Sequence, residues 1–129
     1  MSEIPAPLAN GRYTLANTLG QGGMATVYGG FDTMLEVDRA VKVLSPALCR
    51  SEKLRKRFLA EARAMAKLRH TNIVTVFDVG LDGETPYIVM DLVDGKTLDA
   101  VLREQNQLSE PQLRKMAVEL ASALHELHL

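Results

Sequence analysis

Leu19-Gly-Gln-Gly-Gly-Met-Ala-Thr-Val27 is the stretch that decides the fold, because its three glycines lie between two β-forming segments. Residues 12–18 precede it and residues 27–31 follow it, and both segments are rich in β-formers. Glycine has no Cβ and adopts backbone conformations that other residues disfavour. We therefore predict a glycine loop that joins two strands and whose N–H groups can fold over a phosphate chain.

Two common phosphate loops do not fit this stretch. In a dinucleotide-binding fingerprint the glycines open a helix, whereas Thr-Val-Tyr at 26–28 does not resemble a helix start. A Walker A loop requires Gly-x-x-x-x-Gly-Lys-Ser/Thr. Gly-Lys-Thr occurs at 95–97, but Met90 stands where the first glycine of that motif belongs.

The pattern that fits is Gly-x-Gly-x-x-Gly-x-Val, closed by a lysine on the next strand. Gly20, Gly22 and Val27 match it, and Ala25 replaces the third glycine. The next predicted strand, residues 39–44, contains Lys42. Alternation puts Lys42 on one face with Ala40 and Leu44. On this segment alone, Lys42 is equally well interpreted as an edge lysine whose stem reaches water.

Size and charge limit the class of protein. The 129 residues suffice for one domain with a modest core. The net charge of −1 gives no general reason for binding nucleic acid or a membrane surface. The single cysteine, Cys49, rules out an internal disulfide and is expected in a connecting loop. No apolar run approaches the length of a membrane span. Residues 1–10 lack the features of a secretory signal, so we expect them to form a flexible leader and the protein to be cytoplasmic.

The rest of the chain predicts one long helix, two strands and two further helices. Residues 54–68 have helical periodicity, with Glu61 beside the apolar face. The basic residues of that helix form either a solvated surface or a docking site for an acidic or phosphorylated segment. Residues 73–77 and 86–91 are predicted strands of a hairpin whose turn contains Asp-Gly at 82–83.

The last two predicted helices span residues 97–105 and 111–127. Thr97 is the expected N-cap of the first helix. Ser109 and Gln112 have the spacing of a capping box for the second helix, which carries an apolar stripe suited to a core or an interface. We interpret the three histidines, His70, His125 and His128, as structural and not as metal ligands.

Taken together, these motifs resemble the N-terminal lobe of a protein kinase, in particular the bacterial serine/threonine kinases of eukaryotic type. The resemblance rests on LGQGGMATVY (19–28), RAVKVL (39–44), RFLAEA (57–62), RHTNIV (69–74) and YIVMDLVDGKTL (87–98). It implies an α+β fold, in which a five-stranded antiparallel sheet with one long helix precedes two helices of an incomplete C-lobe. The implied boundaries are a leader at 1–11, the ATP-binding lobe at 12–93 and the start of the C-lobe at 94–129.

The resemblance assigns residues to an ATP site. Lys42 matches the lysine that contacts the α- and β-phosphates, and Glu61 matches the helix glutamate that pairs with it. Met90 matches the gatekeeper, and the backbones of Asp91 and Val93 match the hinge groups that bind the adenine edge. The adenine ceiling corresponds to Leu19, Val27 and Ala40. The loop over the phosphates comprises Leu19, Gly20, Gln21, Gly22, Gly23, Met24, Ala25, Thr26 and Val27.

Two family motifs are absent from the 129 residues. Phosphoryl transfer needs a carboxylate that orients the attacking hydroxyl and metal ions that bridge the phosphates. The family supplies them from His-Arg-Asp…Asn and Asp-Phe-Gly, and neither His-Arg-Asp nor Asp-Phe-Gly occurs here. Asp78 precedes Val-Gly, but it lies before the hinge and is rejected as a metal ligand. The Mg²⁺ ligands are thus expected outside this chain.

We therefore expect the ATP-binding part of an enzyme that phosphorylates Ser/Thr hydroxyls of protein substrates, inactive on its own. Because the partners of its last helix would lie beyond Leu129, much of that apolar stripe is expected to face water. The alternative is a free-standing nucleotide-binding or dimerisation module, which forms a homodimer or pairs with another kinase lobe. A third interpretation is a gene remnant without function.

Overall fold

The computed structural model describes residues 4–96 and 98–127 and contains two compact units. The first unit comprises the chain up to Lys67 together with Thr75–Leu92, and the second comprises Leu68–Val74 together with the chain from Val93 onward. We predicted from the sequence that residues 12–93 form one lobe, whereas residues 68–74 belong to the second unit of the structure. None of the helices that the structure describes is long and apolar enough to cross a membrane.

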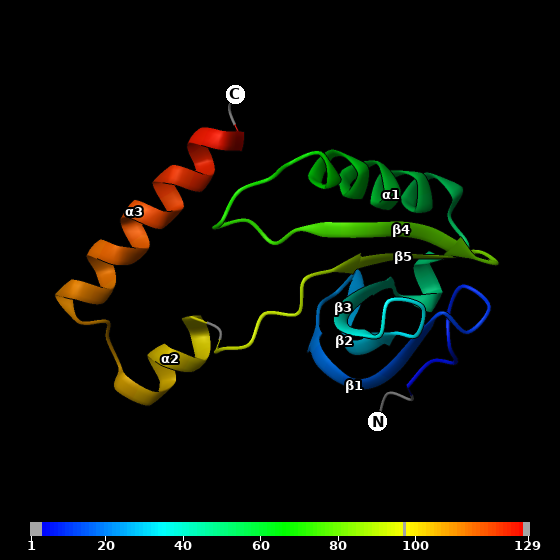
Figure 1. Ribbon diagram of the computed structural model, residues 1–129, viewed down its shortest axis with the longest axis horizontal. Coiled ribbons are helices and arrows are strands. Elements are labelled where there is room, and N and C mark those ends of the chain that lie inside the picture. The colour runs from blue at the N-terminus through cyan, green and yellow to red at the C-terminus, as the bar shows by residue number, and fades with distance from the viewer. Residues whose placement is uncertain (1–3, 97, 128–129) are drawn as a thin grey trace. The chain divides into compact units, whose positions relative to one another are not determined.

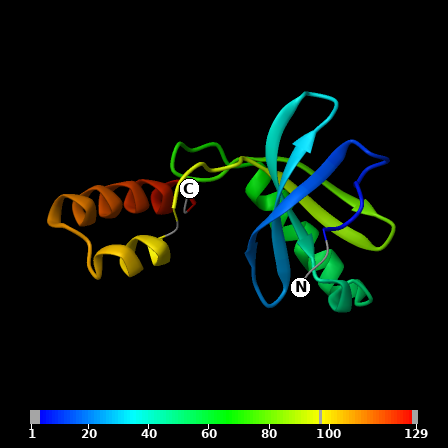
Figure 2. The ribbon, with the colours of Figure 1, turned by 90° about the horizontal axis from the view of Figure 1, so that it is seen from below.

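A five-stranded antiparallel sheet forms the first unit, with one long helix over one of its faces (Figures 1 and 2). In space the strands follow the order β1-β2-β3-β5-β4. Helix α1 covers Glu52–Ala66, and a 3₁₀ turn, η1, precedes it at Pro46–Leu48. The strands are β1 (Tyr13–Gln21), β2 (Ala25–Asp32), β3 (Val37–Leu44), β4 (Val76–Asp82) and β5 (Thr85–Met90). The predicted architecture of this unit is confirmed.

The two faces of the sheet bury different clusters. On the α1 side, Leu44 packs with Phe58 and Ile88, and Cys49 belongs to the same cluster. Cys49 lies in the segment that connects η1 to α1, as expected, and it is also buried in this core, where its thiol donates to the Leu44 carbonyl at 3.4 Å. The opposite face buries Leu8, Tyr13, Tyr28, Val41, Val43, Tyr87 and Val89. The alternation predicted for β3 is therefore observed.

The N-terminal segment is a structured part of this unit from Leu8 onward, so the expected flexible leader is wrong there. The backbone N–H of Leu8 donates to the Tyr13 carbonyl at 2.9 Å, and the Tyr13 N–H donates back at 3.2 Å. The reversal between them uses left-handed conformations at Ala9, Asn10 and Gly11. It returns the apolar Leu8 side chain to the sheet, where it is 5% exposed.

The β4–β5 hairpin has the predicted turn but a different start. Gly83 has a φ of +62°, which the Asp-Gly signal anticipated. Strand β4 begins at Val76 and not at residue 73, because the Ile73 N–H is bonded to the His70 carbonyl at 3.1 Å. Residues before Val76 therefore form a loop.

A partly buried ion pair that the sequence did not predict lies at the end of β2. The Asp32 carboxylate accepts two bonds from the Arg12 guanidinium, at 3.1 and 3.0 Å. It also accepts the backbone N–H groups of Met34 and Leu35, at 2.9 and 3.1 Å. The Arg12 bonds, with the smaller backbone contribution, lower the pKa of Asp32 from 3.8 to about 2.

Replacement of Asp32 by asparagine is expected to make the stability of the first unit less dependent on acid pH. A carboxyl whose pKa is depressed on folding stabilises the fold above its unfolded pKa, and this contribution is lost as pH falls from about 4 through about 2. Asp32→Asn should lower the free energy of unfolding by about 1–3 kcal/mol at pH 7. Its difference from the wild-type value should be smaller at pH 2.

Urea midpoints at pH 7, 4 and 2 measure this effect. The control Asp38→Asn removes an exposed carboxylate of β3 and should change stability by no more than about 0.5 kcal/mol. If the urea midpoints of wild type and Asp32→Asn differ by the same amount at all three pH values, the interpretation is wrong.

The second unit contains helices α2 (Leu98–Gln105) and α3 (Glu110–Leu127). Thr97, the expected N-cap of α2, and His128 lie outside the described residues. The capping box of α3 is confirmed, since Gln112 N–H donates to Ser109 Oγ at 3.3 Å and Ser109 N–H donates to Gln112 Oε1 at 2.8 Å. The apolar stripe of α3 is exposed as expected, with Leu113, Leu120 and Leu124 between 52% and 57% exposed.

Residues of the 68–74 loop are hydrogen-bonded to α3. The Asn72 side-chain amide donates to the Glu119 carbonyl at 2.9 Å, and His70 Nε2 lies 2.8 Å from Ser122 Oγ. His70 Nδ1 also accepts the Asn72 N–H at 2.9 Å. These bonds explain why the loop belongs to the second unit, and they give His70 the structural role that the sequence predicted.

Loss of the Ser109 hydroxyl is expected to loosen the first turn of α3. Ser109→Ala removes the acceptor of the Gln112 N–H, and such N-cap losses cost about 0.5–2 kcal/mol. Amide hydrogen exchange should accelerate at the start of α3. The control Ser122→Ala removes the contact with His70 further along α3 and should leave that first turn unchanged. Unchanged exchange in Ser109→Ala would refute the capping role.

Candidate phosphate-binding site

The glycine loop is a short link, because β1 and β2 together include most of the quoted stretch. Residues 22–24 join the two strands, and the Gly22 N–H donates to the Ala25 carbonyl at 2.9 Å. Among the glycines described, left-handed φ values occur at Gly11 and Gly83. The expectation that the loop glycines supply such conformations is therefore wrong. Ala25, which replaces the third glycine, has no positive φ either.

The glycines of this loop have open space where a side chain would begin. A Cβ placed on Gly20 or Gly23 would meet no atom within 4 Å, and one on Gly22 would meet the Ala25 carbonyl at 3.6 Å. Neither a special φ nor packing inside the chain therefore requires glycine here. Bare backbone in open space suits close approach by a group from outside the chain.

Sheet register brings four of the predicted ATP-site residues onto the α1 side. Val27 is directly opposite Lys42, and Ala40 is directly opposite Met90. Residues directly opposite each other on neighbouring strands share a face. Ala40 is buried, whereas Val27, Lys42 and Met90 are partly exposed. The side chain of Lys42 therefore has apolar neighbours and remains accessible.

A cavity of about 150 Å³ lies at this lysine within the first unit. The end of the glycine loop supplies Met24 and Ala25, and β3 supplies Lys42. Helix α1 supplies Arg57, Phe58 and Glu61. The Lys42 ammonium lies 6.0 Å from the centre of the Phe58 ring. Two cations and one carboxylate thus line a small hollow next to bare loop backbone.

The expected ion pair between Lys42 and Glu61 is not formed. The Glu61 carboxylate instead accepts Arg57 Nε at 3.4 Å, and no ion pair of Lys42 occurs among residues 4–96 and 98–127. Arg57 is four residues before Glu61, so the two side chains are neighbours on the helix surface. The sequence did not single out Arg57 or Phe58 for this cavity, although the four-residue spacing was a usable signal for Arg57.

The remaining predicted site residues lie around these elements. Leu19 and Gln21 are exposed at the end of β1, and Thr26 is buried in β2. The predicted hinge residue Asp91 uses its backbone N–H within the chain, because this group donates to the Thr75 carbonyl at 3.0 Å. Val93 is 67% exposed and belongs to the second unit.

Asp78 has a structural role. Its carboxylate accepts the Tyr13 hydroxyl at 2.5 Å and the Val79 N–H at 2.9 Å. Burial, followed by this hydrogen bond, raises the pKa of Tyr13. Within the described part of the chain, no three His, Cys, Asp or Glu residues form a group that could hold a metal ion.

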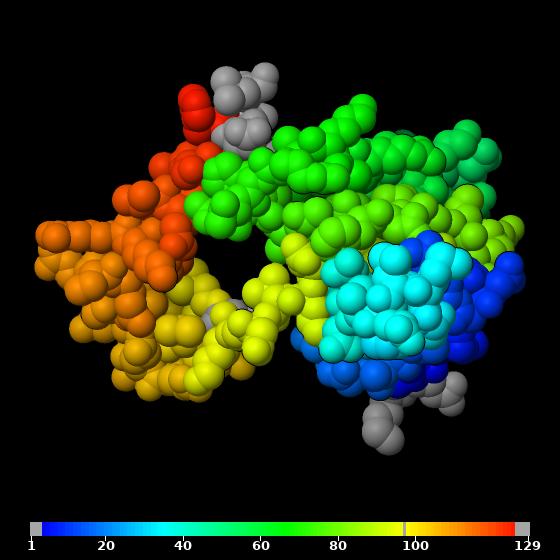
Figure 3. All heavy atoms as spheres, in the orientation of Figure 1, coloured from blue at the N-terminus to red at the C-terminus, as the bar shows by residue number. Residues whose placement is uncertain are grey.

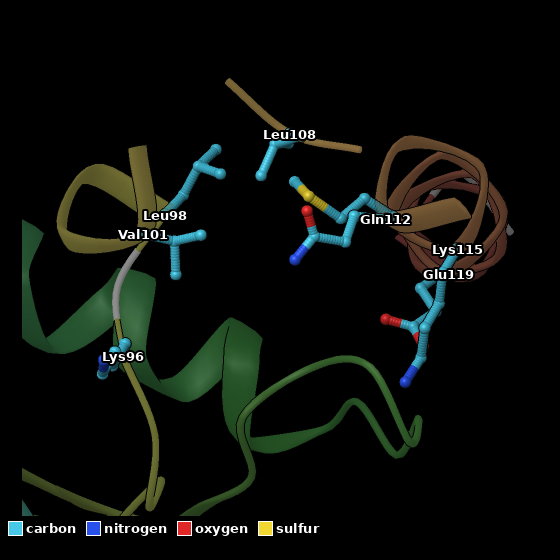
Figure 4. A pocket seen from close by; sticks show the side chains of 8 residues that line it. Lys96, Leu98, Val101, Leu108, Gln112, Lys115 and Glu119 are labelled. Atoms are coloured by element: carbon cyan, nitrogen blue, oxygen red, sulfur yellow. The ribbon is translucent and has the colours of Figure 1, made fainter. Parts of the chain in front are cut away.

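A larger hollow of about 370 Å³ lies between α2 and α3 of the second unit (Figure 4). In Figure 4, Leu98 and Val101 of α2 point toward the same space as Leu108 and Gln112. Both lysines of this hollow have a carboxylate partner. Lys96, from the Gly-Lys-Thr that resembled a Walker A end, binds both oxygens of Glu104 at 2.7 Å, and Lys115 lies 3.9 Å from Glu119. Since both lysines are paired, the cavity at Lys42 is the stronger candidate for a phosphate site.

Comparisons with known proteins agree with this geometry. A family model described as protein kinase domain matches residues 13–129. The serine/threonine-protein kinase PksC of Streptomyces coelicolor is 45% identical over 94% of the chain, and the probable serine/threonine-protein kinase PknB of Bifidobacterium longum is 35% identical over 98%. A crystal structure of a single-site mutant of the Mycobacterium tuberculosis PknI kinase domain superposes with a TM-score of 0.80 at 28% identity over 98% of the chain. The chain spans 23% of PksC, 20% of that PknB and 52% of the PknI structure.

Proposed function

Since this chain belongs to the protein kinase family, among its serine/threonine-protein kinases, we propose that it forms the ATP-binding portion of such an enzyme. The complete enzyme would transfer the γ-phosphoryl group of ATP to Ser/Thr hydroxyls of protein substrates. The observation that carries the proposal is the cavity where Lys42 of β3 meets the end of the glycine loop and α1.

Different residues of the site contact the phosphates and the adenine of ATP. The open backbone at Gly20, Gly22 and Gly23 lets phosphate oxygens approach the loop closely. Lys42 supplies a positive charge, and charge-assisted hydrogen bonds to phosphate are about twice as strong as neutral ones. The apolar surface of Val27, Ala40 and Met90, on the same face of the sheet as Lys42, suits an adenine ring.

Mg²⁺ accompanies ATP in this family, and two metal ions are held by motif residues that the printed sequence does not contain. Glu61 is the carboxylate of the cavity, and Arg57 already pairs with it. The residues described here therefore do not fit a magnesium centre, and no step of the proposal depends on one.

ATP binding is tested by thermal unfolding of the chain at increasing MgATP concentration. A ligand that binds only the folded state stabilises it by about 2.7 kcal/mol at a concentration of 100 Kd. The transition temperature should therefore rise steadily with MgATP and stay constant with matched MgCl₂. A transition that MgATP does not move would contradict nucleotide binding.

We further propose that residues 1–129 transfer no phosphate by themselves, because they contain neither His-Arg-Asp nor Asp-Phe-Gly. Incubation of the purified chain with radiolabelled ATP, Mg²⁺ and a mixture of protein substrates should leave the label on ATP. A catalytically competent PksC sample serves as the positive control. Label transfer by the chain above the buffer level would refute this part of the proposal.

A second candidate function, a non-catalytic binding module, is favoured by the apolar face of α3. Val118 is 70% exposed on this helix, and Leu113 and Leu120 are more than half exposed. Exposed apolar surface of this kind promotes association. Sedimentation equilibrium separates the two candidates, since a module that dimerises through α3 should become monomeric in Leu120→Lys. A wild-type chain that stays monomeric at all concentrations would exclude the homodimer.

A further inference from the structure

Charge in the cavity at Lys42 is unevenly paired. Lys42 and Arg57 provide two positive groups and Glu61 provides one negative group. Glu61 is bound to Arg57, at 3.4 Å, while Lys42 makes no ion pair within the described ranges 4–96 and 98–127. One carboxylate therefore faces two cations that line the same small space.

The contact between Arg57 and Glu61 is weak enough to exchange. Both side chains are about 70% exposed, and their separation of 3.4 Å is long for a charged hydrogen bond. Exposed pairs with this spacing on a helix contribute little to stability. Lys42, by contrast, projects from a strand whose neighbours Val41 and Val43 are buried, so its backbone position is fixed. The exposed Glu61 carboxylate therefore has room to change its partner.

We infer that Arg57 regulates the phosphate cavity by competing with Lys42 for the Glu61 carboxylate. In the state described here, Arg57 holds Glu61, and the Lys42 ammonium has no carboxylate to fix its direction. In the alternative state, Glu61 turns to Lys42 and positions its ammonium, and Arg57 is released. Arg57 is thus a positioning residue that acts through Glu61. The regulatory consequence rests on the proposed ATP site, whereas the competition itself does not.

A carbodiimide cross-linking experiment on the chain without nucleotide measures this competition directly. The reagent joins a carboxylate and an amine into an amide, with loss of water, only where the two groups meet. Peptide mapping by mass spectrometry then gives the yield of the Lys42–Glu61 link. In Arg57→Ala the yield should rise about twofold, the scale of an exposed helical ion pair, and Arg57→Gln should give the same rise.

Lys56→Ala is the matched control. It breaks the 3.0 Å pair of Lys56 with Glu52, which has the same spacing on the same helix and similar exposure, but neither residue lines the cavity. The Lys42–Glu61 yield should therefore equal that of wild type. Glu61→Gln removes the carboxylate and should abolish the link, which verifies its assignment.

An unchanged or lower yield in both Arg57 variants would overturn the inference. So would an equal rise in Lys56→Ala, because a general loosening of α1 would then explain the result. Failure of the proposed function would look different: MgATP would not shift the unfolding transition of the wild-type chain, whatever the cross-linking yields. The two results are therefore read from separate experiments.

Discussion

Lys42→Ala is expected to remove most of the stabilisation of the chain by MgATP. The Lys42 ammonium lines the cavity at the end of the glycine loop and has no ion-pair partner among the described residues, so its charge is available to a phosphate. A hydrogen bond to a charged group contributes about 1.5–3 kcal/mol, which corresponds to an affinity about 10 to 150 times weaker without it. Isothermal titration calorimetry with MgATP gives this ratio.

Lys96→Ala is the matched control for this substitution. It removes the lysine of the Gly-Lys pair at 95–96, whose ammonium is bound to Glu104 in the second unit. Its affinity for MgATP should equal that of wild type. If Lys42→Ala binds MgATP as tightly as wild type, or if Lys96→Ala loses binding instead, the cavity at Lys42 is not the phosphate site.

The substitution with the largest expected cost in stability is Leu44→Ala. Leu44 is 1% exposed at the end of β3, and its cluster joins the sheet to Phe58 and Leu59 of α1. Removal of three carbons there loses apolar burial and leaves a cavity, which costs about 2–5 kcal/mol for leucine. In urea unfolding, the midpoint should fall while the slope of the free energy against urea concentration stays the same.

Leu35→Ala makes the same chemical change at the surface. Leu35 is 58% exposed at the turn between β2 and β3, the cyan segment that lies on the visible surface in Figure 3. Its effect should stay within about 0.5 kcal/mol. Equal losses for the two variants would mean that α1 and the sheet do not share the core described here.

The features that the sequence predicted well depend on residues that are close along the chain. The face of Lys42 follows from alternation within β3, and the cap of α3 follows from Ser109 and Gln112, three residues apart. The turn at Gly83 is also local. The single five-stranded antiparallel sheet depends on distant segments, and its prediction came from the resemblance of the whole motif series to one family.

The features that the sequence missed depend on contacts between distant residues. Arg12 and Asp32 are twenty residues apart, and only the pairing of β1 with β2 brings them together. Leu8 enters the core through a reversal that few propensity signals indicate. The partner of Glu61 depended on a choice between a residue of its own helix and one of β3, which composition and spacing leave undecided.

The most direct test of the central claim is an NMR titration of the isotope-labelled chain with MgATP. The account predicts shifts at the amides of residues 20–27 and of Lys42, with saturation at one equivalent, while the residues that line the hollow between α2 and α3 stay unchanged. Shifts that instead cluster at Lys96, Leu108 and Lys115, or a spectrum that MgATP leaves unchanged, would contradict it.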